Sequence, residues 1–337
     1  MMAVKKPAKK PITLRKVYYR RAKFNTRTSQ SLQQLVAHAL GSQTTIGQRL
    51  EPLGSMAPEF RCVAGWKTHG QYLCGHVVTF ERGRFQTIID DDANAKTLKL
   101  SALAPPKTGK TQHQYIPGVL YFVMHKNHVV VMQTAAMRAS ALEQHLLWLL
   151  RSKTQTISTQ QGFGLSDEPQ KATRERIRKS HVKNVMIGRP LMESVSLQDD
   201  NAKTEVRKFK PEGAVLSFLR EMLDQNQFEK LGLEDSLFDG NLEVWIQIRH
   251  PKRIRSKSAD SVKLLDDISI ALRDLEEDEA RLELNDGSVV TGKELKVSGD
   301  VEVLTSTSKG MLEEDDTYDQ MIAWLETQLR NGVIQPD

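Results

Sequence analysis

The chain has 337 residues, of which 39% are hydrophobic and 27% charged, and its formal net charge is +6. This length exceeds that of a typical single core, so the sequence predicts two domains of a soluble globular protein. No apolar run reaches the roughly 20 residues that cross a bilayer, and the basic first residues lack the apolar core of a signal peptide. Two cysteines do not make a disulfide framework, which favours a reducing, cytoplasmic setting.

The distribution of charge along the sequence is more informative than the net charge. The first 27 residues hold ten Lys and Arg residues and no acid, 171–189 holds seven against one acid, and 249–257 holds five and no acid. Residues 274–279 and 313–319 are acidic instead. Segregation of this kind suggests a polyanionic partner, with solvated faces and a flexible basic tail as the alternative.

The N-terminal part of the chain predicts an α+β domain. Residues 1–11 are rich in Lys and Pro and are expected to be disordered, so the domain spans 12–153. It begins with a basic strand over 12–23. Tyr18 and Tyr19 of this strand could stack on bases, or the strand could be an edge strand protected by its Lys and Arg residues. A Leu-rich helix follows.

Consecutive strands come next, and their apolar and aromatic alternation places them at 60–66, 72–80 and 85–89. A hairpin turn over Glu81–Arg84 is expected to join the last two. A further hairpin turns at Lys126–Asn127, and the flanking His125 and His128 are expected to be exposed. An amphipathic helix over 138–151 closes the domain.

Three stretches of this domain could carry chemistry. Four possible zinc ligands have a spacing that matches no standard pattern, namely Cys62, His69, Cys74 and His76. Asp90–Asp92 could ligate a divalent cation, but three acids at a strand end are more typical of a solvated turn. Residues 104–111, APPKTGKT, resemble a relaxed phosphate-binding loop, but Pro117 falls where the helix should follow, which favours a basic surface loop.

The second half predicts another α+β domain. Residues 154–172 are polar and are expected to form a linker, and the domain spans 173–337. Its central stretch is 214–257, an apolar helix followed by a turn at Asp239–Gly240. An alternating strand over 242–248 then runs straight into a dense cluster of cations.

Beyond the cluster, an amphipathic helix precedes a hairpin with its turn at Asn285–Gly287. Short strands are expected over 295–297 and 301–304. Acidic residues beginning at Asp315 favour the start of a last helix. Trp324 lies off the apolar stripe of that helix and could face a partner or shield a neighbour. The predicted fold class is therefore α+β, with two domains that are each a largely antiparallel sheet with flanking helices.

No catalytic signature is evident. A metal-dependent nuclease would need two acids and a lysine around a metal, and Asp239 and Glu243 are followed by Trp245 where the lysine should be. Neither a nucleophile signature nor a sequence-reading DNA-binding motif appears. The sequence therefore predicts a non-enzymatic protein without a cofactor or metal, and a divergent nuclease is the alternative.

The order of elements resembles a family. The features are the basic first strand, the hairpin FVMHKNHVVVMQT leading to a Leu-rich helix, the acidic segment LEDSLFDG and the strand LEVWIQIR before the cation cluster. In these the chain resembles the RexA proteins of lambda-type phage exclusion, and in outline the KwaB-type proteins of the Kiwa defence system. The resemblance implies a homodimer that binds double-stranded DNA without sequence specificity, senses phage DNA, and acts through a membrane-protein partner without inserting into the membrane itself.

Non-specific binding to a DNA backbone needs only convergent Lys and Arg side chains. The hypothesis is thus a sequence-nonspecific DNA sensor or effector of abortive infection, with an adaptor for RNA or protein as a further alternative. The residues expected to contact phosphates are Arg174, Arg176, Arg178, Lys179, Lys183, Arg207, Lys208, Lys210, Arg249, Lys252, Arg253, Arg255 and Lys257.

Overall fold

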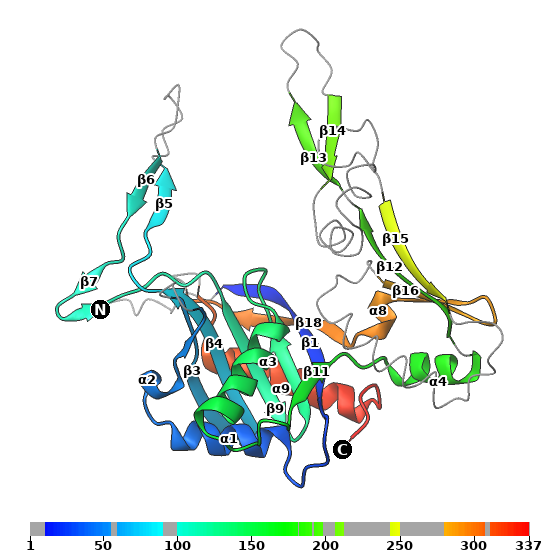
Figure 1. Ribbon diagram of the computed structural model, residues 1–337, viewed down its shortest axis with the longest axis horizontal. Coiled ribbons are helices and arrows are strands. Elements are labelled where there is room, and N and C mark those ends of the chain that lie inside the picture. The colour runs from blue at the N-terminus through cyan, green and yellow to red at the C-terminus, as the bar shows by residue number, and fades with distance from the viewer. Residues whose placement is uncertain are drawn as a thin grey trace, which may run out of the picture. The chain divides into compact units, whose positions relative to one another are not determined.

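The computed structural model describes residues 11–54, 59–89, 100–180, 182–190, 192–197, 206–211, 243–249, 280–306 and 311–336, and the statements below concern these residues. They fall into two units (Figure 1). Unit 1 contains the described residues up to Lys171 and from Lys296 onward, and unit 2 contains those between Ala172 and Leu295. Within the described ranges, no helix has both the length and the apolar character needed to cross a membrane.

Unit 1 is built on one antiparallel sheet with the strand order β11-β1-β10-β9-β4-β3-β2, and β18 also pairs with β1. Its strands are β1 (Ile12–Phe24), β2 (Glu51–Pro52), β3 (Glu59–His69), β4 (Tyr72–Glu81), β9 (Val119–His125), β10 (His128–Met132), β11 (Phe163–Ser166) and β18 (Ser298–Leu304). Its helices are α1 (Leu32–Ser42), α2 (Ile46–Arg49), α3 (Ala139–Trp148), which continues as the π-helical turn η1 (Leu149–Lys153), and α9 (Glu314–Arg330).

Helices cover both faces of this sheet, which gives unit 1 three layers. Phe122 of β9 belongs to the core cluster that includes the apolar residues of α1 and α3. Its chain neighbours Tyr121 and Val123 belong to the second cluster, which includes those of α9. Figure 1 shows α1 and α3 on one side of the sheet and α9 on the other. Since successive side chains of a strand point to opposite faces, β9 and β10 read as unbroken apolar runs.

β1 has neighbours on both of its edges. Tyr18–Arg21 pairs with β10, Ile12–Tyr18 with β18, and Arg21–Phe24 with β11. Tyr18 pairs with both β10 and β18, and Arg21 pairs with both β10 and β11. A residue can pair with two strands only along its two edges, so β18 and β11 lie on the edge of β1 opposite β10. The expectation of an edge strand is therefore wrong for the second half of β1. Base stacking by Tyr19 is also wrong, because its ring is buried and its hydroxyl lies 2.8 Å from Nδ1 of His128.

The hairpin between β9 and β10 holds the start of α1. It turns at Lys126, with φ of 52°, and Asn127, as the sequence predicts. The first N–H groups of a helix lack partners within the helix. Here the side chains of Ser31 and Gln34 form a capping box, the N–H of Gln33 donates to the Lys126 carbonyl (3.0 Å), and the first helical N–H donates to Oδ1 of Asn127 (2.9 Å).

A buried polar cluster joins α3 to β2 and β3. Arg61 donates to both carboxylate oxygens of Glu51 (3.0 and 3.2 Å) and to the side chain of Gln144 (3.2 Å). The Val63 N–H donates to Nε2 of His145 (3.2 Å), and Nδ1 of the same ring lies 2.8 Å from Glu51. A backbone N–H can only donate, so Nε2 carries no proton, and Nδ1 donates its proton to the carboxylate. His145 is therefore held as the neutral ring.

A second buried ion pair fastens β11. The Arg20 side chain forms a salt bridge with Asp167, and the two side chains are only 1% and 2% exposed. Asp167 directly follows β11, whose residues pair with the second half of β1. Removing one partner of such a pair leaves a buried charge, which typically costs about 3–5 kcal/mol. The pair thus holds the chain after β11 against the sheet.

Unit 2 has a smaller antiparallel sheet in the order β15-β12-β16-β17 and a separate two-stranded sheet of β13 and β14. Its strands are β12 (Val182–Pro190), β13 (Met192–Leu197), β14 (Val206–Pro211), β15 (Glu243–Arg249), β16 (Ala280–Leu284) and β17 (Val289–Thr291), and its helices are α4 (Lys171–Ser180) and α8 (Gly292–Leu295). The predicted turn at Asn285–Gly287 joins β16 to β17, with Gly287 in the left-handed region at φ of 83°.

The α+β class with antiparallel sheets and flanking helices is thus observed, but its division along the chain differs from the expectation. β11 lies inside 154–172, the expected linker, and is part of the unit 1 sheet. β18 and α9 fall in unit 1 rather than in the domain expected over 173–337. The physical reason is that Val301 and Val303 of β18 and the apolar stripe of α9 complete the second core of that sheet.

Two local expectations are also wrong. The turn over Glu81–Arg84 exists, but β4 does not pair with β5 (Gln86–Ile89), which pairs instead with β6 (Leu100–Leu103). Instead of a strand over 295–297, a short helix, α8, ends at Leu295.

Trp324 is buried, 9% exposed, and its indole packs so closely against Gly299 that no larger residue would fit there.

The buried histidine predicts how stability depends on pH. Burial, the largest cause, lowers the pKa of His145, and the arginines nearby lower it further, against the raising effect of Glu51. The unfolded chain, with an ordinary histidine pKa of about 6.5, then binds a proton that the folded chain does not bind. Stability is therefore full above about pH 6.5 and falls as the pH drops towards the lower pKa of the folded state.

Chemical unfolding of the full chain between about pH 7 and pH 5 measures this effect. We expect His145→Gln to lower stability at pH 7 but to flatten the loss on acidification relative to the unmodified chain. Glu51, whose pKa is lowered by His145 and Arg61 against burial, adds a second loss in the same direction only below about pH 4.3. Equal pH slopes for the two proteins would contradict the neutral buried ring.

Candidate nucleic-acid interface

The helix α4 carries four of the expected phosphate contacts. Thr173 and Ile177, four residues apart, are its buried residues, so they define the face that packs inward. Arg176, Arg178 and Lys179 are exposed, and Arg174 is half-buried. Two basic residues in the last turn also suit the negative end of the helix dipole. The sequence therefore forms a helix with one small apolar stripe and a cationic outer surface.

Some of these cations already have partners within unit 2. Arg176 pairs with Glu294 (2.6 Å) and donates to the Val289 carbonyl (3.3 Å). Burial alone would raise the pKa of Glu294, but the Thr291 N–H and Arg176 outweigh it and lower the pKa. Lys183 forms a salt bridge with Glu283, which also accepts from Asn184. Arg176 and Lys183 therefore contribute less charge to a polyanion than the sequence suggests.

Arg178 and Lys179 differ from these two residues. Neither forms an ion pair with another residue in the described part of unit 2, and both are exposed. They lie in the last turn of α4, four and three residues before β12 begins at Val182. No carboxylate in the described part of unit 2 therefore balances their charge.

The strand register brings a second cationic stretch to the same place. In the antiparallel pair of β12 and β15, Arg249 is opposite Asn184, near the start of β12. The chain thus leaves β15 at the end of the sheet where α4 leads into β12. The remaining expected contacts of the cluster follow β15 in the sequence and lie outside the described residues; these are Lys252, Arg253, Arg255 and Lys257.

Three further expected contacts lie on β14. Arg207 pairs with Ser196, Lys208 with Val195, and Lys210 with Glu193 across β13. The register places these residues on a two-stranded sheet separate from that of α4 and Arg249.

An acidic residue that the sequence analysis did not single out also lies at this end of the sheet. Asp286 accepts from the side chain of Ser180, the last residue of α4, and from the N–H (2.8 Å) and hydroxyl (2.7 Å) of Ser288. The hydrogen bond from Ser180, the largest cause, and those from Ser288 lower the pKa of Asp286 to about 2. The sequence Asn285–Gly287 predicted a hairpin turn. No local sequence pattern indicates that Asp286 of this turn would bind the end of a helix about a hundred residues away.

The described residues contain no cluster of three or more possible metal ligands. Cys62 and Cys74 are buried in β3 and β4, where His76 Nδ1 lies 3.1 Å from the hydroxyl of Tyr318 and His69 Nε2 lies 3.4 Å from Asp319. These histidines therefore contact α9. Asp90–Asp92 lies outside the described residues, so the carboxylate alternative has no structural account.

The stretch APPKTGKT is a hairpin in the structure. Its strands are β7 (Lys107–Thr108) and β8 (Thr111–Gln112), and Gly109 at the turn has φ of 60°. The His113 N–H then donates to the Pro106 carbonyl (3.0 Å). The chain after the TGK sequence is a strand rather than a helix, so no helix N–H groups face a phosphate there. The interpretation as a basic surface loop is confirmed.

The turn histidines are not exposed as expected. His128 is buried at 1% exposure, and His125 is half-buried, with its ring parallel to that of His128 at 6.3 Å and tilted against Tyr72 at 5.3 Å. Both side chains extend over the second face of the sheet near α9. Their burial follows from the sheet having a covered face on each side.

No family model and no curated protein matches this sequence. The resemblance to RexA and KwaB-type proteins and the function that it implies therefore depend on the residues and the geometry given above.

Thiol chemistry tests the assignment of the two cysteines as core residues. Burial, the largest cause, raises the pKa of Cys62 to about 11 and that of Cys74 to about 12. The thiolate is the reactive form and the metal ligand, so both thiols should be inert in the folded chain. We expect a thiol reagent at pH 8 to modify neither cysteine in the native protein and both after unfolding. Rapid modification in the native protein, or protection that a zinc chelator removes, would contradict it.

Proposed function

We propose that the chain is a sequence-nonspecific, non-enzymatic DNA-binding protein that works in the cytoplasm. The observation that supports it is the convergence of two cationic stretches at one end of the β15-β12-β16-β17 sheet. The exposed Arg178 and Lys179 end α4 there, and the register of β12 with β15 brings Arg249 to the same end. These two stretches are separated by some seventy residues of sequence, so their meeting is a property of the fold.

Charge of this kind suits a phosphate backbone. Each phosphate that a Lys or Arg neutralises releases condensed counterions, so affinity falls steeply as salt rises, with a slope of about 0.9 per phosphate on logarithmic axes. Such contacts fix position on the duplex but do not read sequence.

The biological part of the proposal comes from the resemblance to RexA proteins. It makes the chain a sensor or effector of phage defence that acts as a homodimer through a partner protein, which the resemblance implies is a membrane protein. Sedimentation of the purified chain tests the dimer. Co-purification from cells before and after infection tests the partner, with a variant deficient in DNA binding as the matched control.

The central prediction concerns the cation cluster after β15. We expect Arg253→Ala combined with Arg255→Ala to weaken binding to unrelated duplexes alike and to reduce the logarithmic salt slope by about 2, as expected for two lost phosphate contacts. Fluorescence anisotropy across a salt series measures both quantities. The control is Lys153→Ala combined with Arg330→Ala, which removes the same charge from exposed sites in unit 1. Unchanged affinity and slope in the cluster variant would reduce the cluster to a solvated surface.

A second comparison separates available cations from paired ones. Arg178→Ala combined with Lys179→Ala should weaken duplex binding, and should lower stability only through the lost interaction with the helix dipole, about 0.3–1 kcal/mol for each residue. Arg176→Ala should also cost up to about 1 kcal/mol of stability, since it removes an exposed ion pair, but should change affinity less. The reverse pattern would show that the helix contacts DNA through Arg176.

The same mixtures test the nuclease alternative. Glu243 begins β15, Asp239 lies outside the described residues, and Trp245 is opposite Gly188 in the register. Adding magnesium or manganese should leave the duplex intact. Cleavage that Glu243→Gln abolishes would replace the proposal with a nuclease, and stronger binding to RNA than to DNA would replace it with an RNA adaptor.

A further inference from the structure

Residues 82–89 and 100–118, which we call the arm, lie in the sequence between β4 and β9 and are not part of the unit 1 sheet. β5 and β6 form a two-stranded ribbon of their own, and β7 and β8 form a second one (Figure 1). Two hydrogen bonds fasten the base of the arm, one between its outgoing and returning segments and one within the returning segment. The Gly83 N–H donates to the Gln114 side chain (2.8 Å), and the Tyr115 hydroxyl donates to the Ala104 carbonyl (3.2 Å). The arm therefore holds a defined shape where it meets the sheet.

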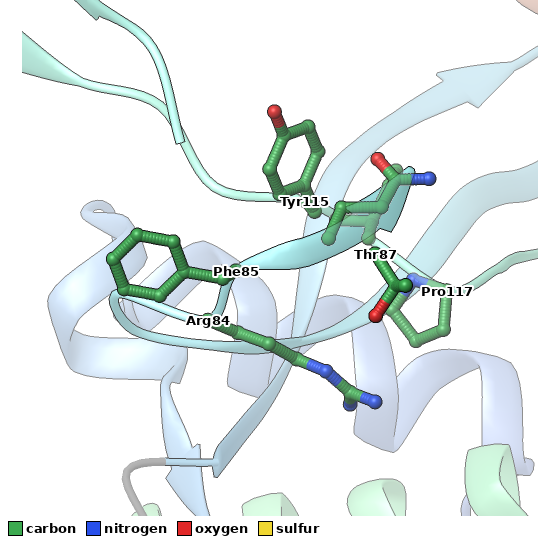
Figure 2. Close-up of a pocket in the computed structure, with 7 residues that line it drawn as sticks. Arg84, Phe85, Thr87, Tyr115 and Pro117 are labelled. Atoms are coloured by element: carbon green, nitrogen blue, oxygen red, sulfur yellow. The ribbon is translucent and has the colours of Figure 1, made fainter. Parts of the chain in front are cut away.

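A cavity of about 280 Å³ lies at this base. The residues that line it are Arg84, Phe85, Gln86, Thr87, Tyr115, Ile116 and Pro117. Figure 2 shows that the Phe85 and Tyr115 side chains come from the outgoing and the returning segment of the arm, and that the Arg84 side chain extends in another direction from the two rings. This volume is at the small end of ligand pockets, so it suits one planar ring system rather than an extended chain.

The apolar groups of the arm are exposed to an unusual degree for a soluble protein. Phe85 is 59% exposed and Ile116 is 45% exposed, and both line the cavity. Ile88 and Leu103, on β5 and β6, are also exposed, at 37% and 46%. Single exposed apolar residues are ordinary, but several on one small element indicate a binding surface.

The charged side chains of the arm restrict the kind of ligand that the cavity can bind. The described residues of the arm include Arg82, Arg84, Lys107 and Lys110 and no Asp or Glu, and Asp90–Asp92, which lie between β5 and β6 in the sequence, are outside the described residues. The nearest carboxylate partner of Arg84 is Glu81, at 3.6 Å, and the arginine side chain remains 62% exposed. A ligand that fits must therefore combine a flat apolar ring with a negative group. A nucleotide has both, in its base and its phosphate.

We propose that the arm cavity binds an unpaired base of a single-stranded nucleic acid. The base stacks on Phe85 beside Tyr115, and Arg84 contacts the adjoining phosphate. In a duplex, each base is stacked and paired with its own neighbours, so its face is not available to the ring. The inference extends the nucleic-acid binding proposed above, but it depends on unit 1 residues, so the two proposals can fail separately.

Anisotropy with the full chain tests it, using labelled oligothymidine and an abasic strand of equal length. The two strands carry the same phosphates, so any preference reports stacking. Since stacking on an aromatic side chain changes affinity by about 5- to 150-fold per base, we expect a preference of that size for oligothymidine. Phe85→Ala should abolish the preference and leave duplex affinity unchanged. Leu103→Ala, which removes an exposed apolar side chain on the same arm outside the cavity, is the matched control and should keep it.

The opposing outcomes are distinct. Equal binding of oligothymidine and the abasic strand would overturn the base site, whatever the duplex result. If sedimentation instead shows that Phe85→Ala converts a dimer to a monomer without changing the strand preference, the cavity is a contact between copies of the chain. Loss of duplex binding in the Arg253→Ala, Arg255→Ala variant with the strand preference intact supports both proposals, because each site then acts alone. Retention of duplex binding in that variant overturns the cluster proposal and leaves the arm untouched.

Discussion

Unit 1 depends on the pairing of β1 along both of its edges. Buried backbone N–H and C=O groups must find partners, and β1 supplies them to β10 on one edge and to β18 and β11 in succession on the other. The same strand contributes Val17 and Tyr19 to the core beside α9, and Ala22 to the core beside α1 and α3. Arg20 adds a buried charge that Asp167 balances. A neighbour lost from β1 would therefore expose backbone groups and apolar side chains together.

The cationic side chains of this protein have two roles, one in the core and one at the surface. Arg20 and Arg61 are buried and hold strands and helices together through Asp167 and Glu51. At the surface, Arg176 is held by Glu294, whereas Arg178, two residues further along the same helix, has no such partner in the described part of unit 2. Counting basic residues in the sequence therefore overstates the charge that a polyanion can use. Within the described residues, the geometry separates the paired Arg176 from the exposed Arg178 and Lys179 at the end of α4.

Local patterns predicted local structure well, because turn chemistry and side-chain period act over a few residues. The turn at Lys126–Asn127 and the hairpin at Asn285–Gly287 are of this kind. The pairing of β1 with β18 could not be predicted, since neither strand carries a mark of a partner almost at the other end of the chain. The same is true of Glu294 as the partner of Arg176. For the candidate interface, the sequence identified the charged residues, but it could not tell paired cations from available ones or show which stretches meet.

The position of unit 2 in the sequence has a consequence for how unit 1 folds while the ribosome makes the chain. Unit 2 lies in the sequence between β11 and β18, so both strands that share one edge of β1 are separated by the whole of it. Because a ribosome makes the N-terminus first, the face of the sheet that α9 covers stays bare until nearly the last residue has been added. A premature stop before residue 298 would thus leave one face of the N-terminal sheet uncovered, although all of its strands except β18 had been made. Late truncations should therefore destroy the earliest part of the protein rather than trim its end.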